Sequence, residues 1–231
     1  MKKIGVIFAD TQEYAPFVRY YSDKKAQEKT VGGCKVTIYK DENENKEIIV
    51  IHSGIGKVNA ANAAAILIYV FGAEVILNAG LSGAVSRLHR EDIVAGTTYT
   101  ECDFDLTAIG YDLGVKPDGE ESVHKADSAL LAYAKNTKLA NLLEDKLGTG
   151  DIFLSDSAKK NIFKEKFDVS AFDMESAAIA SICAKNDVAF LSVRKISDDA
   201  DDASESDYRE MNNREEDILS KIISDIIVQI S

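Results

Sequence analysis

The chain has 231 residues, 45% of them hydrophobic, with 27 Lys and Arg against 39 Asp and Glu, so its formal net charge is −12. This length and apolar content fit one packed domain, expected to span residues 1–231, and exclude intrinsic disorder as the main state. The excess of negative charge argues against nucleic acid as a partner, because a phosphate backbone is bound by clustered Lys and Arg.

Short apolar runs rich in Val and Ile, bounded by Gly, Asn or Asp, predict buried strands. In chain order they occupy residues 4–9, 36–39, 47–52, 75–79, 93–99 and 189–193. Helical patterns cover the Ala-rich stretch 57–71 and the small-residue stretch 176–185, and the Ile and Leu residues from Ile218 to Ile230 mark one face of an amphipathic helix. The alternation of strands and helices predicts an α/β fold.

Connections between these elements indicate a mixed, mostly parallel central sheet flanked by helices. The strand at 48–51 passes through a Gly-containing turn into the Ala-rich helix and then into the strand at 75–77, which is a βαβ unit. Residues 35–39 and 47–51 flank a polar turn at 40–46, which is typical of a hairpin. No internal repeat or flexible linker interrupts the pattern, so a single domain is expected.

The cysteines and the hydropathy of the chain predict a cytoplasmic protein. Cys34, Cys102 and Cys183 are widely separated and odd in number, which gives no disulfide framework and fits a reducing compartment. The apolar run at the N-terminus stops at Asp10 and is too short for a signal peptide. No stretch approaches the roughly 20 apolar residues of a membrane helix, so no membrane partner is expected.

Three carboxylates follow predicted strands or open a helix, where open α/β sheets bind ligands. Glu13 comes after the first strand, Asp198 follows the last one, and Glu175 begins an otherwise apolar helix. Each taken alone also fits a helix cap or a solvated loop. Glu175 is the most unusual of the three, because a charge buried beside Ala177 and Ala178 is costly without a purpose.

Two Gly-containing segments offer backbone N–H groups to a ligand. Ser53-Gly54-Ile55-Gly56-Lys57 resembles a phosphate-cradling loop but lacks the ending of a P-loop and the third Gly of a dinucleotide fingerprint. The stretch Asn78-Ala79-Gly80-Leu81-Ser82-Gly83 suits close approach of a flat polar ligand, or else is a tight strand-to-helix turn.

No metal site is expected. His52, His89 and His124 are scattered without a His or Cys at ligand spacing. The acidic run Asp198-Asp199-Ala200-Asp201-Asp202 lacks the spacing of an EF-hand and fits a solvated loop.

Taken together, these segments resemble the 5'-methylthioadenosine/S-adenosylhomocysteine nucleosidases of the nucleoside phosphorylase family. The matching pieces follow the family's order along nearly the whole chain: Ile4-Gly5-Val6-Ile7 leading to Glu13, Ser53-Gly54-Ile55-Gly56-Lys57-Val58, Asn78-Ala79-Gly80, Ala108-Ile109-Gly110-Tyr111, Gly150-Asp151-Ile152-Phe153, Asp173-Met174-Glu175 and the stretch from Arg194 to Asp201. No single piece is decisive, but seven in register are specific for the family.

The resemblance implies hydrolysis of the N-glycosidic bond of an adenine nucleoside with a 5'-thio substituent, without metal or organic cofactor. It implies that Asp198 protonates purine N7, that Glu13 activates the attacking water, and that Glu175 holds the ribose hydroxyls. Binding roles fall on Met174 beside Glu175, Phe153 and Leu154 at the base with Ser82 and Gly83 nearby, and Ile55 at the ribose or 5' side. Ile109, Tyr111 and Pro117 fall where a partner subunit closes the 5' pocket, which implies a homodimer.

This chain departs from the family pattern around the 5' pocket. The usual Met-Glu-Glu-Glu run is Asp10-Thr11-Gln12-Glu13 here, so Asp10 replaces an apolar residue, and Tyr208 stands where a Phe is common. Both changes make the pocket more polar, which bears on the preferred 5' group. A nucleosidase acting on futalosine-type or deoxyadenosine substrates therefore remains an alternative.

Two further alternatives stay open. A phosphorylase of the same fold would need cations for phosphate; Arg87 and Arg90 follow the 78–83 segment, although a surface role fits them better. A binding module without turnover would not need all three carboxylates. Residues 198–217 hold ten Asp or Glu and two Arg, a net of −8, so most of the negative charge lies beside the proposed acid and disfavours an anionic nucleophile.

Overall fold

The computed structural model describes residues 1–24, 26–117, 122–202, 204–214 and 217–231. The strands in these ranges are β1 (Lys2–Phe8), β2 (Ala26–Val31), β3 (Cys34–Asp41), β4 (Lys46–His52), β5 (Val75–Ala84), β6 (Ile93–Glu101), β7 (Val123–Lys125), β8 (Leu142–Thr149), β9 (Ala171–Asp173) and β10 (Ala189–Asp198). The helices are α1 (Thr11–Tyr20), α2 (Lys57–Tyr69), α3 (Ser128–Asn136), α4 (Ser157–Phe167), α5 (Ser176–Ala184), α6 (Ser204–Asn212) and α7 (Ile218–Gln229), with a short 3-10 helix, η1 (Thr107–Ile109).

The strands form one mixed sheet in the order β10-β6-β8-β9-β5-β1-β4-β3-β2, with β7 paired to β6. Strands β4, β1, β5 and β10 run parallel to one another, whereas β2, β3 and β4 are joined as antiparallel hairpins. Because β10 pairs with both β5 and β6, the strands β5, β10, β6, β8 and β9 close into a ring. The predicted α/β class with a mixed sheet flanked by helices is confirmed.

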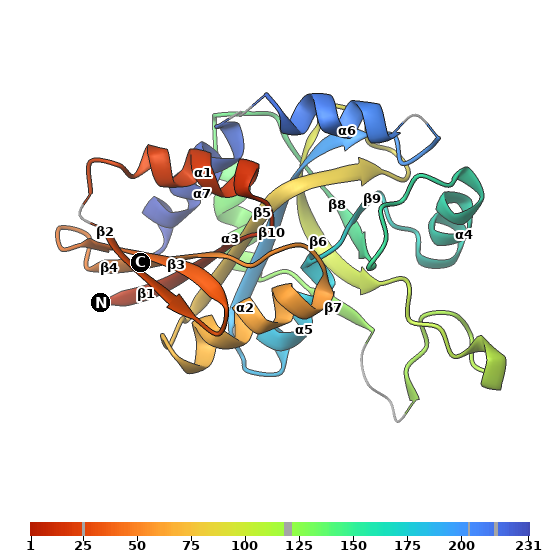
Figure 1. Ribbon diagram of the computed structural model, residues 1–231, viewed down its shortest axis with the longest axis horizontal. Helices are drawn as coiled ribbons and strands as arrows, with labels where there is room; N and C mark the ends of the chain where they lie inside the picture. Colours follow the sequence, from red (N-terminus) through yellow and green to blue (C-terminus); the bar gives the residue numbers. More distant parts are fainter. Residues whose placement is uncertain (25, 118–121, 203, 215–216) are drawn as a thin grey trace.

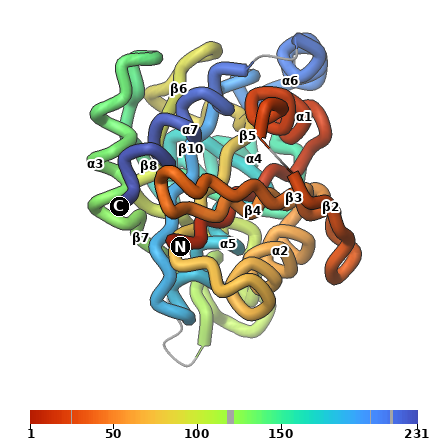
Figure 2. The backbone as a smooth tube through the Cα atoms, turned by 90° about the vertical axis from the view of Figure 1, so that its left-hand side faces the viewer, coloured from red at the N-terminus to blue at the C-terminus, as the bar shows by residue number. Residues whose placement is uncertain are grey.

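Helices cover both faces of the open part of the sheet (Figure 1). One apolar cluster packs α2 and α5 against one face, and a second packs α1, α3 and α7 against the other. Figure 2, turned by 90°, shows α1 and α2 on opposite sides of β2, β3 and β4. The amphipathic pattern that predicts the C-terminal helix matches its burial, since Ile222, Ile223, Ile226 and Ile227 are all buried.

The predicted βαβ unit is β4–α2–β5, and β1 lies between its two strands. Ile4 of β1 pairs with Ile48 on one side and with Val75 on the other. Ala is the best helix former, and its small side chain lets α2 approach the sheet closely. Ala60, Ala63 and Ala64, spaced at three and four residues, are buried on that face.

The segment 78–83 is not a strand-to-helix turn. Strand β5 continues through it to Ala84, and β10 likewise continues beyond its predicted end at residue 193 to Asp198. Both extensions are paired with each other, from Ala79 opposite Val193 to Gly83 opposite Asp198. The polar ends of these two central strands therefore lie side by side.

None of the helices in the described part of the chain is long and apolar enough to span a bilayer. The three cysteines are buried and free of disulfides.

Candidate active site

A cavity of about 340 Å³ opens at the carboxyl ends of β1, β5 and β10 and is bordered by α6. This edge of a parallel sheet is where ligands bind in open α/β folds. The cavity collects residues that are far apart in the sequence, including ten of those predicted for the site: Glu13, Ile55, Ser82, Gly83, Phe153, Leu154, Met174, Glu175, Asp198 and Tyr208.

Three predicted binding residues lie outside this cavity. Ile109 and Tyr111 are exposed on and after η1, and Pro117 lies further along the same segment. This segment projects from the body of the molecule at the lower right of Figure 1. A single chain therefore does not bring these three residues to its own cavity.

Glu13 reaches the cavity from the first turn of α1. Asp10 is the N-cap of this helix and bonds the N–H of Gln12 at 2.7 Å, while Glu13 accepts the N–H of Asp10 at 3.3 Å, which together form a capping box. The other oxygen of Glu13 accepts the N–H of Leu81 at 2.9 Å. Burial raises the pKa of Glu13 to about 7, although the nearby Arg194 guanidinium opposes this shift.

Gly80 makes room for the group around Glu13. A Cβ at this position would lie 2.6 Å from Glu13 Oε1 and 2.7 Å from Arg194 Nη1. Such distances are far inside van der Waals contact, so any side chain here would push both charged groups away. The Gly in the predicted ligand segment is therefore required by the packing of the site.

Arg194 is fully buried in the middle of the carboxylates. Its Nε lies 3.3 Å from Asp173 Oδ2 and its Nη1 lies 3.5 Å from Glu175 Oε2. It also donates to Asn78 Oδ1 at 2.6 Å and to Ser192 Oγ at 3.1 Å. Buried carboxylates need such a partner, because an unpaired charge in the interior is very costly.

Glu175 is the N-cap residue of α5 and points into the cavity. It accepts the backbone N–H of Gly56 at 3.1 Å, from the start of α2. Burial raises the pKa of Glu175, against the attraction of Arg194. The helix itself is capped by Asp173, whose Oδ1 accepts the N–H groups of Glu175 and Ser176 at 2.9 and 2.8 Å.

Asp198 ends β10 and is only 2% exposed. The register of β10 against β5 shifts between Ile196 and Asp198, and such a bulge redirects a side chain at the end of a strand. Ser197 Oγ donates to Asp198 Oδ2 at 2.7 Å, and the N–H of Ala200 donates to Oδ1 at 2.9 Å. The interpretation of Asp198 as part of a solvated acidic loop is therefore wrong.

The remaining lining groups are aromatic or neutral. The rings of Phe153 and Tyr208 meet edge to face with centroids 5.5 Å apart, and Phe153 is 44% exposed. Burial raises the pKa of the Tyr208 hydroxyl above its ordinary value. Ser82 Oγ is buried and has no hydrogen-bond partner among the described groups, so it can bond a ligand.

Two amides of the loop at 53–57 are already bonded to carboxylates and are not free for a phosphate. The N–H of Gly56 is bonded to Glu175, and the N–H of Lys57, the first residue of α2, is bonded to Asp151 Oδ1 at 2.7 Å. A helix N-terminus attracts anions, and here carboxylates of the same chain occupy it.

Arg87 and Arg90 lie away from the cavity and make ion pairs elsewhere. Arg87 pairs with Asp145 and Asp168, whereas Arg90 pairs with Asp207 and Glu210 of α6. Among the described residues that line the cavity, none is Lys or Arg. No three His, Cys, Asp or Glu side chains in the described ranges are grouped to hold a metal ion.

The sequence alone assigns no role in the site to Arg194 or Asp173, although both lie in segments that carry the family resemblance. A signal for Arg194 was present, because it stands in the strand Ala189–Asp198 beside the apolar Val193. A charge in a buried strand requires a buried partner, and Asp173 and Glu175 supply it.

The arrangement suits a reaction that develops positive charge. Glu13, Asp173 and Glu175 surround a single guanidinium, and Asp198 lies across β5 from Glu13. Two carboxyl groups in different surroundings on two sides of a bound molecule can act as acid and base, as in glycoside hydrolysis.

Comparison of the sequence with known proteins identifies the same family as the sequence motifs do. A family model described as the phosphorylase superfamily matches residues 3–228. The chain is 36% identical over 204 residues to the 5'-methylthioadenosine/S-adenosylhomocysteine nucleosidase of Bacillus thuringiensis subsp. konkukian, with 85% of each chain covered. Its identity to the nucleosidase of the same name from Bacillus anthracis is also 36%, with the same coverage.

Solved structures share the whole fold. A mutant of Helicobacter pylori MTAN with 5'-methylthioadenosine in the active site matches with a TM-score of 0.93 at 27% identity over 100% of both chains. The futalosine hydrolase of Helicobacter pylori strain 26695 matches with a TM-score of 0.92 at 27% identity, over 99% of this chain and 98% of that chain.

Proposed function

The chain belongs to the phosphorylase superfamily and, within it, to the 5'-methylthioadenosine/S-adenosylhomocysteine nucleosidases, and from this membership we propose how its cavity works. The enzyme hydrolyses the N-glycosidic bond of 5'-methylthioadenosine and S-adenosylhomocysteine, releasing adenine and the 5'-thioribose. The observation that carries the mechanism is the meeting of Glu13, Glu175 and Asp198 in one cavity.

Asp198 acts as the general acid and Glu13 as the general base. Asp198 gives its proton to purine N7, the C1'–N9 bond breaks with its electron pair going to the base, and the ribose becomes an oxocarbenium-like cation. Water then bonds to C1' and loses a proton to Glu13. A positioned acid or base contributes roughly 10²- to 10⁴-fold each, and the raised pKa of Glu13, about 7, suits it to accept that proton near neutrality.

Glu175 binds the ribose hydroxyls and stabilises the cationic sugar. One of its oxygens is fixed by the N–H of Gly56 and the other faces Arg194 at 3.5 Å. Three carboxylates around one guanidinium leave an excess of negative charge, which is worth more to a cation in a water-excluded site than in solvent.

The order of the strands supports one direction for the bound nucleoside. Asp198 ends β10, Ser82 and Gly83 lie on β5, Asp10 follows β1 and Ile55 follows β4. Since β10, β5, β1 and β4 are neighbours in that order, a base held at Asp198 directs its ribose and 5' group toward Asp10 and Ile55.

Water is favoured over phosphate as the nucleophile. The two amides at the start of α2 are bonded to Glu175 and Asp151, and the described lining of the cavity holds no Lys or Arg. A phosphate ion there would meet several carboxylates, and the one nearby guanidinium, that of Arg194, is already paired with Asp173 and Glu175.

Asp10 and Tyr208 leave a second candidate substrate class. Both are polar groups in the cavity, and a futalosine hydrolase shares the fold at a TM-score of 0.92. Comparing kcat/KM for nucleosides with a 5'-methylthio, a 5'-hydroxyl and a bulky 5'-carboxyaryl group separates the classes. Highest efficiency on the carboxyaryl substrate would replace the 5'-thio assignment.

The enzyme works as a cytoplasmic homodimer in methionine salvage under this proposal. Ile109 is 69% exposed and Tyr111 is 40% exposed on a segment that projects from the body, and such apolar surface is typical of an interface. Three buried thiols without a disulfide fit a reducing compartment. Sedimentation at increasing protein concentration tests the dimer, and a monomer throughout would contradict it.

Conservative variants of the two proposed catalytic residues test their roles. We expect Glu13→Gln and Asp198→Asn each to lower kcat by at least about 10²-fold, because each removes a proton acceptor or donor and preserves the shape. Both variants should still bind substrate in calorimetric titration. Wild-type rates for both variants would show that the acid and base lie elsewhere.

A further inference from the structure

Asp151 lies beside the cavity in the loop between β8 and Phe153, and it caps a helix that is not its own. The N-cap of α2 is Gly56, which has no side chain to bond the free amides of the first turn. Asp151 Oδ1 accepts the N–H of Lys57 at 2.7 Å instead. The acidic group therefore comes from a segment 94 residues away in the sequence.

The neighbouring amide of the same helix start is bonded to Glu175. The N–H of Gly56 reaches Glu175 Oε1 at 3.1 Å, so two successive N–H groups bind two carboxylates from different loops. Gly56 has a φ of +100°, and a Cβ there would lie 3.0 Å from Asp151 Oδ1. The position of Gly56 is consequently tied to Asp151 and Glu175 at once.

Asp151 is itself held in place by a small charged network. Its own N–H donates to Asp103 Oδ2 at 2.8 Å, and Asp103 Oδ1 accepts Lys57 Nζ at 2.6 Å. Lys57 Nζ also donates to Glu101 at 2.8 Å. Hydrogen bonds to charged groups are among the stronger ones, so the start of α2, the loop of Phe153 and the end of β6 form one fixed unit.

From these contacts we propose that Asp151 is a positioning residue for the hydrolysis reaction. By capping α2 it keeps the N–H of Gly56 on Glu175, and so it orients the carboxylate that binds the ribose hydroxyls. Asp151 is not among the described residues that line the cavity. This role rests on the proposed function, because it acts through the assignment of Glu175 to the ribose.

The test compares substrates with and without the hydroxyls that Glu175 binds. Asp151→Ala is assayed for adenine release from 5'-methylthioadenosine and from its 2'-deoxy and 3'-deoxy analogues. We expect kcat/KM to fall at least about tenfold for the ribose substrate and less than about threefold for the analogue whose missing hydroxyl is the partner of Glu175. A role confined to folding would lower the values for all substrates equally.

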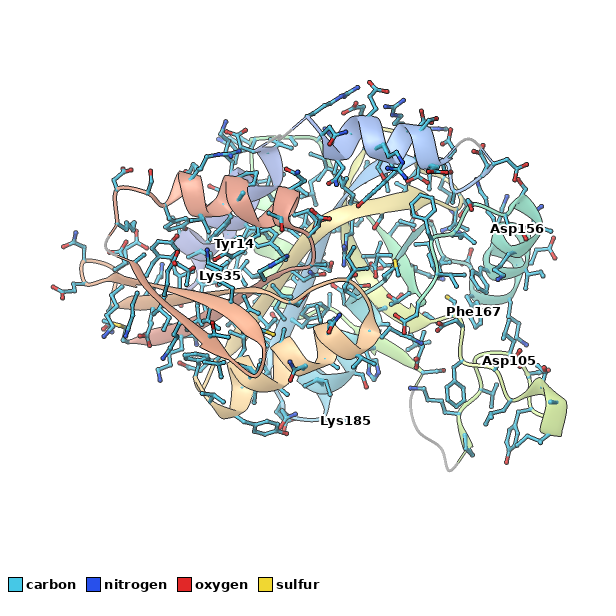
Figure 3. All side chains as sticks on the ribbon, in the orientation of Figure 1. Tyr14, Lys35, Asp105, Asp156, Phe167 and Lys185 are labelled. Carbon is cyan, nitrogen blue, oxygen red and sulfur yellow. The ribbon has the colours of Figure 1, made fainter. Side chains whose placement is uncertain are left out.

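Three further variants sharpen the comparison. Asp151→Asn keeps an oxygen for the N–H of Lys57 and should restore most of the activity, since Asn is as good a cap as Asp. Gly56→Ala crowds Asp151 Oδ1 with a Cβ at 3.0 Å and strains the backbone at a φ of +100°, so it should reproduce the selective loss. Asp156→Ala is the matched control, because Asp156 caps α4 through Ala158 and Lys159 on the outer edge of the molecule (Figure 3).

The outcomes separate this inference from the function on which it rests. A loss confined to the ribose substrate in Asp151→Ala and Gly56→Ala, with Asp156→Ala near the wild type, supports the positioning role. Equal losses on all substrates, or the same loss in Asp156→Ala, would overturn it while leaving hydrolysis intact. If Asp151→Ala does not fold, Gly56→Ala decides by the same substrate ratio. No adenine release by the wild type would instead reject the proposed function.

Discussion

Glu13 belongs both to the capping box of α1 and to the buried lining of the cavity. As part of the capping box it accepts the N–H of Asp10, and as a lining residue it lies in a buried site beside other carboxylates. Burial dominates and raises the pKa of Glu13 from 4.5 to about 7. A base with this pKa is partly ionised at neutral pH, which suits the removal of a proton from water.

The pH dependence of the reaction follows from this shift. Only ionised Glu13 accepts a proton, so we expect kcat/KM to fall as pH decreases through about 7, by about tenfold per unit at lower pH. The measurement is steady-state hydrolysis of 5'-methylthioadenosine between pH 5 and pH 9. A rate that stays constant down to pH 5 would contradict the role of Glu13.

The pH dependence of folding stability tests the raised pKa of Glu13 independently of the kinetics. Because the folded pKa of Glu13 is raised, the stability that it contributes is complete below 4.5 and is lost as pH rises through about 7. Glu13→Gln should therefore raise Tm at pH 8 and leave it nearly unchanged at pH 4. An equal shift at both pH values would show that packing, not ionisation, is responsible.

The sequence predicts only some of the residues of the candidate site. The rule that ligands meet the ends of strands identifies Glu13 and Asp198, and the charge at the head of an apolar helix identifies Glu175. The rule does not show that Arg194 lies among the carboxylates, because a strand pattern does not tell which loops face a buried side chain. The roles of these residues as acid, base and ribose ligand came from the resemblance and remain predictions.

Helix α6 brings Tyr208 to the cavity and is tied to the loop before β6 by ion pairs. Arg90 lies 3.1 Å from Asp207 and 2.7 Å from Glu210, on either side of Tyr208 in the sequence. Arg214 forms ion pairs with both Glu210 and Glu91, each at an N–O distance of 2.6 Å. The helix is mostly polar and buries only Ser204 and Met211 among its described residues, and these ion pairs connect it to the loop before β6.

Removing this attachment should weaken substrate binding more than it slows the chemical step. Exposed pairs each contribute little, so we expect Arg90→Met to raise KM by only about threefold, with little change in kcat. Salt screens such pairs, so a higher ionic strength should raise the wild-type KM in the same direction. Steady-state kinetics at low and high salt measure both effects.

Arg209→Met is the control for this prediction. Arg209 pairs only with Glu205 of the same helix among the contacts described, at 2.8 Å and with both side chains exposed. Its loss should leave KM unchanged. A similar rise in KM for both variants would mean that the helix itself, and not its attachment through Arg90, was affected.

At the level of elements, the sequence predicted those with a strong pattern. The buried strands, the Ala-rich helix and the C-terminal helix were expected near their observed positions. Strand β8 was missed because the charged residues Glu144, Asp145 and Lys146 break its pattern, and β9 is only three residues long. Helices α4 and α6 are mostly polar, and α1 contains Pro16, which disfavours a helix in sequence reasoning.

The arrangement of the whole sheet could not be read from the sequence. A βαβ unit gives the direction of two strands but not the insertion of β1 between them. The pairing of β10 with both β5 and β6, which closes the ring, joins segments about 100 residues apart. This closure nevertheless positions the site, because it places the end of β10, with Asp198, beside Ser82 and Gly83 of β5.

The net charge of the whole molecule disfavours phosphate as the nucleophile, as the contacts at the cavity do. The chain carries −12, and residues 198–217, which include Asp198 and Tyr208 of the cavity lining, hold ten Asp or Glu against two Arg. A negative field lowers the local concentration of anions and does not affect a neutral nucleoside. The molecule as a whole therefore favours water over phosphate.

The identity of the nucleophile tests the central claim most directly. The wild-type enzyme is given 5'-methylthioadenosine in ¹⁸O-labelled water with added phosphate, and the sugar product is analysed by mass spectrometry. Hydrolysis predicts free adenine and a 5-methylthioribose that carries one ¹⁸O at C1, at a rate independent of phosphate. A sugar 1-phosphate, or adenine release that requires phosphate, would contradict the account.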